Sequence, residues 1–141
     1  MTPPLADIDH LHVHVSDRAA AESWYARVLG LHRDPALSFW MRDGGPLVVR
    51  NGDGSVHLSL FERPFGNGRT TLAFRVSGIV FLPWLRHLRD QLPSPPAPVD
   101  HEVSWSLYFQ DPDGNPFEIT SYEYDVVRDG LHRGADSASP A

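Results

Sequence analysis

Cysteine is absent from the 141 residues of this chain. Its absence excludes disulfide bonds, thiolate metal ligands and a cysteine nucleophile. Long apolar segments are absent as well, since no run reaches the roughly 18 residues of a membrane helix, and we expect no membrane partner. Residues 1–9 lack the basic and apolar regions of a signal peptide, which makes a cytoplasmic location the expectation.

Basic residues are scarce: 12 Lys and Arg stand against 18 Asp and Glu, for a formal charge of −6. Proteins that bind the nucleic-acid backbone normally present a basic face, so the balance argues against a nucleic-acid partner. A small molecule or a cation remains possible as a ligand. The hydrophobic share of 41% and the length are typical of one globular domain.

The first half of the chain has the pattern of a small mixed module. Apolar and polar residues alternate over residues 7–15, which predicts a strand with His10, His12 and His14 on one face. A helix is predicted over residues 18–29, capped by Ser16 or Asp17 and ended by Gly30. Three short strands are predicted to follow, at residues 37–42, 46–50 and 55–63.

The second half repeats this plan. A strand is predicted over residues 69–78 and an amphipathic helix over 78–92, with Pro83 placed in its first turn. A proline-rich connector at residues 93–99 cannot be helical. Two strands follow, over the ranges 102–110 and 115–123. Residues 131–141 have little apolar content, and we expect a disordered tail there.

The two halves align with each other. Residues 9–16 match 70–77, and this alignment places Thr71 opposite His10 and Ala73 opposite His12. The sequence therefore predicts an α+β fold of two tandem βαβββ modules, about 7–63 and 69–125, within one domain at residues 1–130. The two modules are expected to form a cupped mixed sheet with His10 and Glu118 inside the cup.

The pieces IDHLHVHVSD, AAAESWYARVLGL, LSLFERP and SLYFQDPDGNPFEIT, in this order, resemble the vicinal oxygen chelate superfamily. That superfamily has the glyoxalase/bleomycin resistance/dioxygenase fold, and the resemblance covers residues 7 to about 123. It implies metal ligands on the first and last strands of each module. Carried over by position, these ligands fall on His10 and Glu118, whereas Thr71 and Ser59 occupy the other two positions.

Several side chains can complete such a site. His57 is the first candidate for a third metal ligand, while His12 fits the role of ligand, general base or outer partner of a ligand. Glu118 can instead form a salt bridge with Arg75, which the repeat places on the same face. Tyr108 suits a hydrogen bond to an oxygen that develops charge, or alternatively a bridge between strands. Further substrate contacts are expected from Arg75, Ser106, Thr71 and Trp40.

Two functions follow from the resemblance. The first is a metal-dependent enzyme, glyoxalase-, dioxygenase- or lyase-like, in which one divalent ion (Fe, Mn, Ni or Zn) binds neighbouring oxygens of a small substrate. Its protons would be handled by Tyr108 or His12. The second is a metal-free protein that binds a small molecule or drug, as bleomycin-resistance proteins do. The resemblance also implies a homodimer.

Overall fold

The computed structural model describes residues 7–63 and 70–137. The chain forms two compact units, Met1–Gly68 and Arg69–Ala141, each with its own four-stranded sheet. Both units run in the order strand, helix, three strands, so the two βαβββ modules predicted from the sequence are confirmed.

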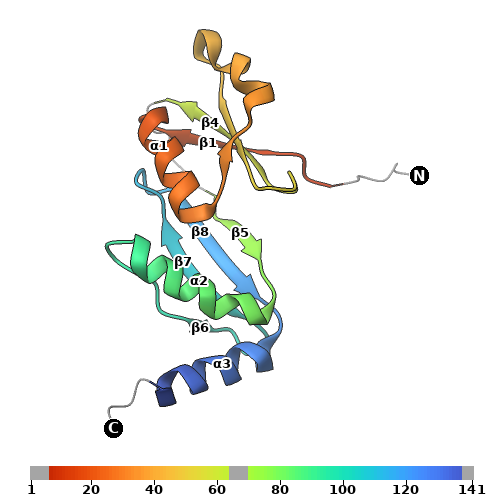
Figure 1. Cartoon of the computed structure of the whole chain (residues 1–141), viewed down its shortest axis with the longest axis vertical. Helices are drawn as coiled ribbons and strands as arrows, with labels where there is room; N and C mark the ends of the chain where they lie inside the picture. Colours follow the sequence, from red (N-terminus) through yellow and green to blue (C-terminus); the bar gives the residue numbers. More distant parts are fainter. Residues whose placement is uncertain (1–6, 64–69, 138–141) are drawn as a thin grey trace, which may run out of the picture. The chain divides into compact units, whose positions relative to one another are not determined.

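The first unit builds its sheet in the order β1-β4-β3-β2 (Figure 1). β1 runs parallel to β4, and the other neighbours are antiparallel. Its elements are β1 (Leu11–Val15), α1 (Arg18–Trp24), the π-helix η1 (Tyr25–Leu29), β2 (His32–Arg33), the 3-10 helix η2 (Pro35–Gly44), β3 (Leu47–Arg50) and β4 (His57–Glu62).

Alternation along β1 decides which side chains enter the core. Val13 and Val15 are buried, while His12 and His14, which alternate with them, are exposed. Burying a valine stabilises the fold by about 1.5–3 kcal/mol, which fixes this face of the strand inward. Asp17 accepts the N–H of Ala20 at 3.0 Å as the helix cap, and the left-handed Gly30 (φ 69°) ends the helical segment, both as predicted.

The strand predicted over residues 37–42 is wrong. This segment belongs to η2, which begins at Pro35 after the cap residue Asp34. Asp34 accepts the N–H of Ala36 at 3.0 Å, and proline at the first helical position is preorganised for a helical turn. The local Asp-Pro-Ala signal therefore prevails over the β-propensity of the aromatic residues, and the additional strand of the module is the two-residue β2.

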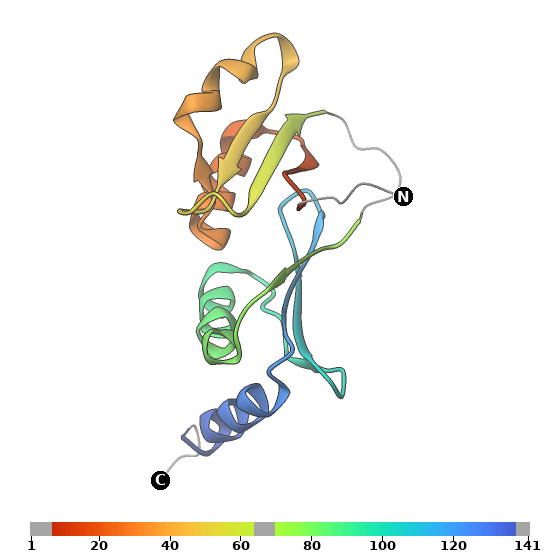
Figure 2. The same cartoon turned by 90° about the vertical axis from the view of Figure 1, so that its right-hand side faces the viewer.

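The second unit arranges its strands in the order β5-β8-β7-β6, again with one parallel pair, β5 and β8. In the views of Figures 1 and 2, α2 covers one face of this sheet and α3 lies beyond it at the end of the unit. Its elements are β5 (Leu72–Arg75), α2 (Gly78–Gln91), β6 (Val99–Asp100), β7 (Trp105–Gln110), β8 (Pro116–Ser121) and α3 (Tyr124–Ser137).

Two expectations for α2 and its connector need correction. Pro83 is the sixth residue of α2 and not part of its first turn, because the helix begins at Gly78. In the first turn of α2, the Gly78 N–H donates a hydrogen bond to Glu123 Oε2 at 2.9 Å. Glu123 is the residue before α3. The connector is not helical, as predicted, but it ends in β6, which is too short to leave an alternating pattern.

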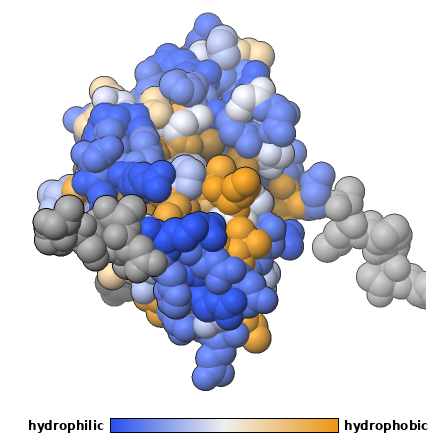
Figure 3. Space-filling view, turned by 60° about the horizontal axis from the view of Figure 1, so that its bottom comes forward, coloured by the Kyte–Doolittle hydropathy of each residue, from blue (hydrophilic) through white to orange (hydrophobic). Residues whose placement is uncertain are grey.

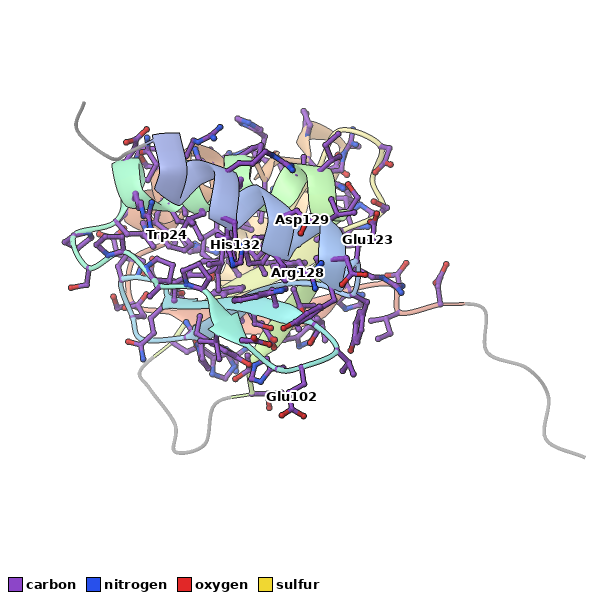
Figure 4. All side chains as sticks on the ribbon, turned by 90° about the horizontal axis from the view of Figure 1, so that it is seen from below. Trp24, Glu102, Glu123, Arg128, Asp129 and His132 are labelled. Atoms are coloured by element: carbon purple, nitrogen blue, oxygen red, sulfur yellow. The ribbon has the colours of Figure 1, made fainter. Side chains whose placement is uncertain are left out.

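Residues 131–137, where the sequence suggests a disordered tail, continue α3 in the structure; residues 138–141 lie outside the described range. Glu123 directly precedes α3, and Arg128, Asp129 and His132 follow along the helix (Figure 4). Few apolar residues hold the helix. Val127 is fully buried, and Tyr124 stacks on Trp105 with ring centroids 5.5 Å apart. Packing on α2 and β7 therefore compensates for the low apolar content.

No helix within residues 7–63 and 70–137 is long and apolar enough to cross a membrane. On the face drawn in Figure 3, hydrophobic residues reach the surface as separate patches among hydrophilic ones. Scattered exposure of this kind is normal for a folded protein and does not by itself mark an interface.

Candidate functional site

A pair of histidines marks the polar face of the first unit. The Nε2 atoms of His10 and His12 lie 3.1 Å apart, and the two rings stack with centroids 5.1 Å apart. His10 Nδ1 lies 2.8 Å from Asp9 Oδ2. Because a carboxylate only accepts, Nδ1 of His10 carries the proton and its Nε2 presents a lone pair when the ring is neutral. Sequence reasoning missed Asp9, although a carboxylate beside a candidate ligand was a usable signal.

Strand β4 also contacts the ring of His12. His12 lies opposite Ser59 in the parallel pairing of β1 and β4. The ring of Phe61, two residues further along β4, packs against the His12 imidazole at 4.8 Å, and Arg63 stands over Phe61 at 5.0 Å. His12 is thus confined between His10 and Phe61.

His57 is placed differently from His12. The paired stretch of β1 and β4 begins at Leu11 and Leu58, so His57 lies one step before it, as His10 does. Its ring nevertheless lies over the turn at Gly54: a Cβ on that glycine would be 3.9 Å from His57 Nε2 and 3.7 Å from Arg50 Nη1. A guanidinium nearby disfavours a bound cation. His57 stays a prediction as a ligand, with less support than His12.

Ser59 occupies the position of the first unit that corresponds to Glu118. In the second unit Glu118 pairs with Ala73, and in the first Ser59 pairs with His12, the residue aligned with Ala73. The pairing therefore reproduces the alignment made from the sequence. Ser59 is buried, at 5% exposure, and its short side chain brings no carboxylate to this position.

The carboxylate of the second unit is held by a buried hydroxyl. Ser106, fully buried on β7, donates to Glu118 Oε1 at 2.6 Å. Thr120 Oγ1 lies 3.2 Å from Ser106 Oγ and donates to the Trp105 carbonyl, also at 3.2 Å. Among the described residues, Glu118 Oε2 receives no hydrogen bond. One oxygen is thereby fixed while the other remains available.

Tyr108 lies directly opposite Glu118 in the β7–β8 pairing and shares its face. Tyr108 is 44% exposed, and its hydroxyl is 2.8 Å from His101 Nε2. The structure therefore gives Tyr108 a partner on the β6–β7 connection instead of a bridge to another strand. The sequence did not indicate His101 as this partner, because a hydrogen bond across a loop leaves no pattern in the sequence.

Thr71, which aligns with His10, and Arg75 are both exposed in the second unit. Thr71 lies just before β5, and Arg75 ends that strand opposite Thr120. No ion pair joins Arg75 to Glu118 within the residues that the structure describes. The salt bridge considered from the sequence is therefore not formed, and Arg75 remains a prediction as a substrate contact.

Trp40 is 45% exposed and lies on η2 with Phe39, and the centroids of the two rings are 5.8 Å apart. The sequence placed Trp40 on a strand, whereas the structure places it on a 3-10 helix. Its contact with substrate stays a prediction.

The second unit has a cleft of about 480 Å³ at the end of its sheet, where Tyr108 contributes to the wall with Leu92, Gln110, Asp111 and Pro116.

Comparison with known proteins decides the family. Residues 7–119 match the model of the Glyoxalase/Bleomycin resistance protein/Dioxygenase superfamily. The chain belongs to this superfamily. The resemblance drawn from the sequence is confirmed, and the match extends over the first unit and most of the second.

Individual members of the superfamily share only a modest sequence identity with this chain. Biphenyl-2,3-diol 1,2-dioxygenase 3 of Rhodococcus globerulus is 31% identical over 133 residues, covering 84% of this chain; the chain spans 63% of that protein. An integron cassette protein from the Halifax Harbour sewage outfall superposes with a TM-score of 0.71 at 21% identity, covering 83% of this chain and 99% of its own. Lactoylglutathione lyase from Agrobacterium tumefaciens gives 0.65 at 23%, covering 84% and 96%. The two structures show the fold alone.

Metal ions are common in this superfamily, and the side chains of this member can be tested for fit. Within the described ranges no three His, Asp or Glu side chains meet as a ready site. The His10 and His12 Nε2 atoms, however, are 3.1 Å apart. Ligand nitrogens at about 2.0–2.1 Å from one ion stand about 3 Å apart in neighbouring positions, so this pair fits a metal. Imidazole and carboxylate together suit iron, zinc, nickel or manganese.

Proposed function

We propose that this chain is a metal-dependent enzyme of the superfamily that acts on a small substrate through two neighbouring oxygens. His10 and Glu118 each provide a ligand to one divalent ion in this proposal. The relative that acts on biphenyl-2,3-diol supports a substrate with adjacent oxygens and favours dioxygenase-like over lyase-like chemistry. We further propose a homodimer located in the cytoplasm.

The observation that carries the proposal is the contact between Asp9 and His10. The 2.8 Å contact fixes the proton on Nδ1 and leaves a lone pair on Nε2 of the neutral ring. A carboxylate behind a histidine is the usual partner of a metal ligand, since it sets the tautomer and raises the basicity of the ring. A histidine needed only to line a polar surface gains little from such a carboxylate.

Glu118 supports the same conclusion from the second unit. Ser106 holds one oxygen of this half-buried carboxylate, and the other oxygen has no partner among the described residues. Taking a carboxylate out of water is costly unless a cation or several hydrogen bonds compensate. A single hydroxyl compensates in part, and a bound ion would supply the rest.

The chemistry divides between the ion and the protein. A bound divalent ion supplies a Lewis acid for a substrate oxygen and, with iron, a means of activating dioxygen. Tyr108 provides a hydroxyl beside Glu118 that can donate to an oxygen developing charge, with His101 as its proton partner. Thr71, Arg75 and Trp40 are proposed to contact the substrate.

A metal-free binding protein is the second candidate. Ser59 and Thr71 stand at two of the four positions where metal-dependent relatives are expected to place ligands. In that case the exposed aromatic rings of Trp40 and Tyr108 would hold a planar ligand without chemistry.

Metal analysis of the full chain separates the two functions. Protein purified without added metal is expected to contain about one divalent ion per chain, lost in both His10→Ala and Glu118→Ala. His32→Ala is the matched control: His32 is exposed on β2, at the opposite edge of the same sheet from β1, and its loss should leave the ion in place. Oxygen uptake with biphenyl-2,3-diol and Fe²⁺ then tests the dioxygenase form. A chain without affinity for Fe, Mn, Ni or Zn would leave the binding protein.

A further inference from the structure

A groove of about 430 Å³ runs between α2 and α3, entirely within the second unit (Figure 1). None of the residues proposed to contact metal or substrate lines it. Its walls include Ile79, Leu82 and Arg86 from α2 and Val126, Gly130 and Arg133 from α3. The volume falls within the range of small-molecule sites, which extends from about 300 to 1,000 Å³.

Close contacts between α2 and α3 show how the two helices are paired along the groove. A Cβ on Gly78 would lie 2.9 Å from Val126 Cβ, and a Cβ on Gly130 would lie 3.0 Å from Leu82 Cδ1. Both pairs are 48 residues apart in the sequence, and the second pair lies about one turn after the first on each helix. The two helices therefore run in the same direction along the groove.

This pairing brings two arginines to the same end of the groove. One further turn places Arg86 of α2 beside Gly134 of α3, whose neighbour in the chain is Arg133. The Arg133 guanidinium lies along the groove, since its Nη2 would be 4.0 Å from a Cβ on Gly130. Both arginines are exposed, and within residues 7–63 and 70–137 neither forms an ion pair.

The usual roles of surface arginines do not account for these two guanidinium groups. Arg128, earlier on α3, pairs with Asp125 and Asp129. A cation in the last turn of a helix stabilises the helix dipole, but the basic residue there is Arg89 in α2, and α3 has none. On a chain with a formal charge of −6, two such cations at one groove favour an anionic ligand.

The other end of the groove is apolar. Ile79 is 81% exposed and Val126 45%, and the half-buried Leu82 lies between them and the arginines. A ligand that removes these side chains from water gains free energy through the hydrophobic effect. Glu123, whose carboxylate accepts the Gly78 N–H beside this end, would repel an anion there. The charge of a ligand is therefore directed to the arginines and its apolar part to this end.

We propose that this groove binds a medium-chain carboxylate. The head group lies between Arg86 and Arg133, because a guanidinium pairs with a carboxylate through two parallel hydrogen bonds. The apolar chain lies along Leu82 toward Ile79 and Val126. This site does not depend on the proposed metal ion, and its ligand is a separate molecule from the substrate of the proposed function.

Calorimetric titration of the full chain with octanoate tests the site, and one binding site per chain is expected. Octylamine has the same apolar chain with the opposite charge, and acetate has the charge without the chain. Neither should bind at concentrations where octanoate saturates the protein. Absence of octanoate binding, or equal binding of octylamine, would overturn the proposal.

Arg86→Gln and Arg133→Gln are each expected to weaken octanoate binding about tenfold or more, because each removes a hydrogen bond to a charged group. Both side chains are exposed, so the fold should be retained, and thermal unfolding checks this. Arg89→Gln is the matched control: it is exposed on the same helix but does not line the groove. Equal weakening in all three variants would assign the effect to overall charge and contradict the proposal.

Two further measurements locate the site and identify its occupant. Octanoate should shift the backbone amide NMR signals of Gly130 and Gly134, and it should bind His10→Ala and Glu118→Ala as it binds the wild type. Failure of the proposed metal site would thus leave this result unchanged. If Arg133→Gln instead dissociates a dimer in sedimentation, the groove holds a second copy of the chain, which would overturn the carboxylate site.

Discussion

At the scale of single residues, the polar face of the first unit depends on side chains that fix one another. Asp9 orients His10, His10 contacts His12, and Phe61 packs against the ring of His12. Each contact removes a rotamer or a tautomer that the next residue would otherwise have to select. If His10 binds the proposed ion, side chains held in this way lose little conformational entropy on binding.

Asp9→Asn tests the first contact in this series. The amide keeps the shape but loses the charge that raises the basicity of His10, and we expect metal affinity to fall by about 10- to 100-fold. Asp7→Asn is the control, because it removes the same charge from an exposed residue two positions earlier. Titration with Zn²⁺ measures both variants. Equal losses in the two would assign the effect to overall charge and contradict the role of Asp9.

A second prediction concerns Asp100, whose pKa is held below its ordinary value, first by the Glu102 N–H and then by the Tyr124 hydroxyl. A lowered folded-state pKa adds stability above the unfolded pKa of about 4, and this is lost as the pH falls through the folded value. The pKa of Tyr124 is raised, chiefly by the same hydrogen bond, so its contribution is lost only at alkaline pH, above about 10.

Tyr124→Phe is therefore expected to lower the thermal midpoint slightly at pH 7, and the difference from wild type should shrink toward pH 3. Tyr122→Phe, at a tyrosine 65% exposed, should show no difference at either pH. The measurement is thermal unfolding at a series of pH values. A difference for Tyr124→Phe that does not change with pH would assign the effect to packing on Trp105 and not to the hydrogen bond.

Residue-scale features were predictable where they depend on periodicity. The exposure of His12 and His14 and the burial of Val13 and Val15 follow from alternation along one strand. The contact of His10 with His12 does not, because it depends on ring rotations that no spacing specifies. The partner of Tyr108 was equally out of reach, since His101 reaches it across a loop.

At the scale of elements, the helices and strands that bury one clear apolar face were predicted correctly. Errors arose in segments where local signals compete. α1, α2, β7 and β8 were found at nearly their observed positions. Residues 37–42 were wrongly assigned to a strand because their aromatic content outweighed the Asp34-Pro35 start signal. The end of α3 was missed because its stability comes from α2 and β7 rather than from its own apolar residues.

The crossing of α2 and α3 gives the prediction at this scale. A Cβ at Gly78 would lie 2.9 Å from both Val126 Cβ and Cγ1 and 3.0 Å from Glu123 Cβ, closer than carbon atoms approach. Gly78→Ala should therefore destabilise the protein by about 1–3 kcal/mol through overpacking. Gly134 in α3 has room, with its nearest contact at 3.7 Å, and Gly134→Ala should add up to about 1 kcal/mol through helix propensity.

Urea unfolding of the two variants measures this pair, with an unchanged slope as evidence that the unfolding transition is comparable. The opposite signs of the two changes in the free energy of unfolding are a sharper test than their magnitudes. A neutral Gly78→Ala would mean that α3 is not held against the start of α2, and the helical assignment of residues 131–137 would lose its packing support.

At the scale of the whole molecule, the internal repeat was the strongest signal in the sequence. It gave the order of elements in both units and the equivalence of Ser59 with Glu118, which the strand pairings reproduce. It also identified the departures at Thr71 and Ser59 from the ligands expected of relatives. What a repeat cannot specify is which chemistry the remaining positions have acquired, because that depends on single substitutions.

The last prediction tests the proposal that one ion binds both His10 and Glu118. A ligand that binds only the folded protein stabilises it by about 2.7 kcal/mol at a hundred times its dissociation constant. If His10 and Glu118 bind the same ion, unfolding either unit releases it, so Zn²⁺ should slow hydrogen exchange in both β1 and β8. His10→Ala and Glu118→Ala should each abolish the effect in both strands, and His32→Ala in neither. Protection limited to β1 would assign the ion to the first unit alone. Binding restored by mixing the two inactive variants would show that partner chains of a dimer supply the two ligands, because each mixed dimer would then keep one intact pair.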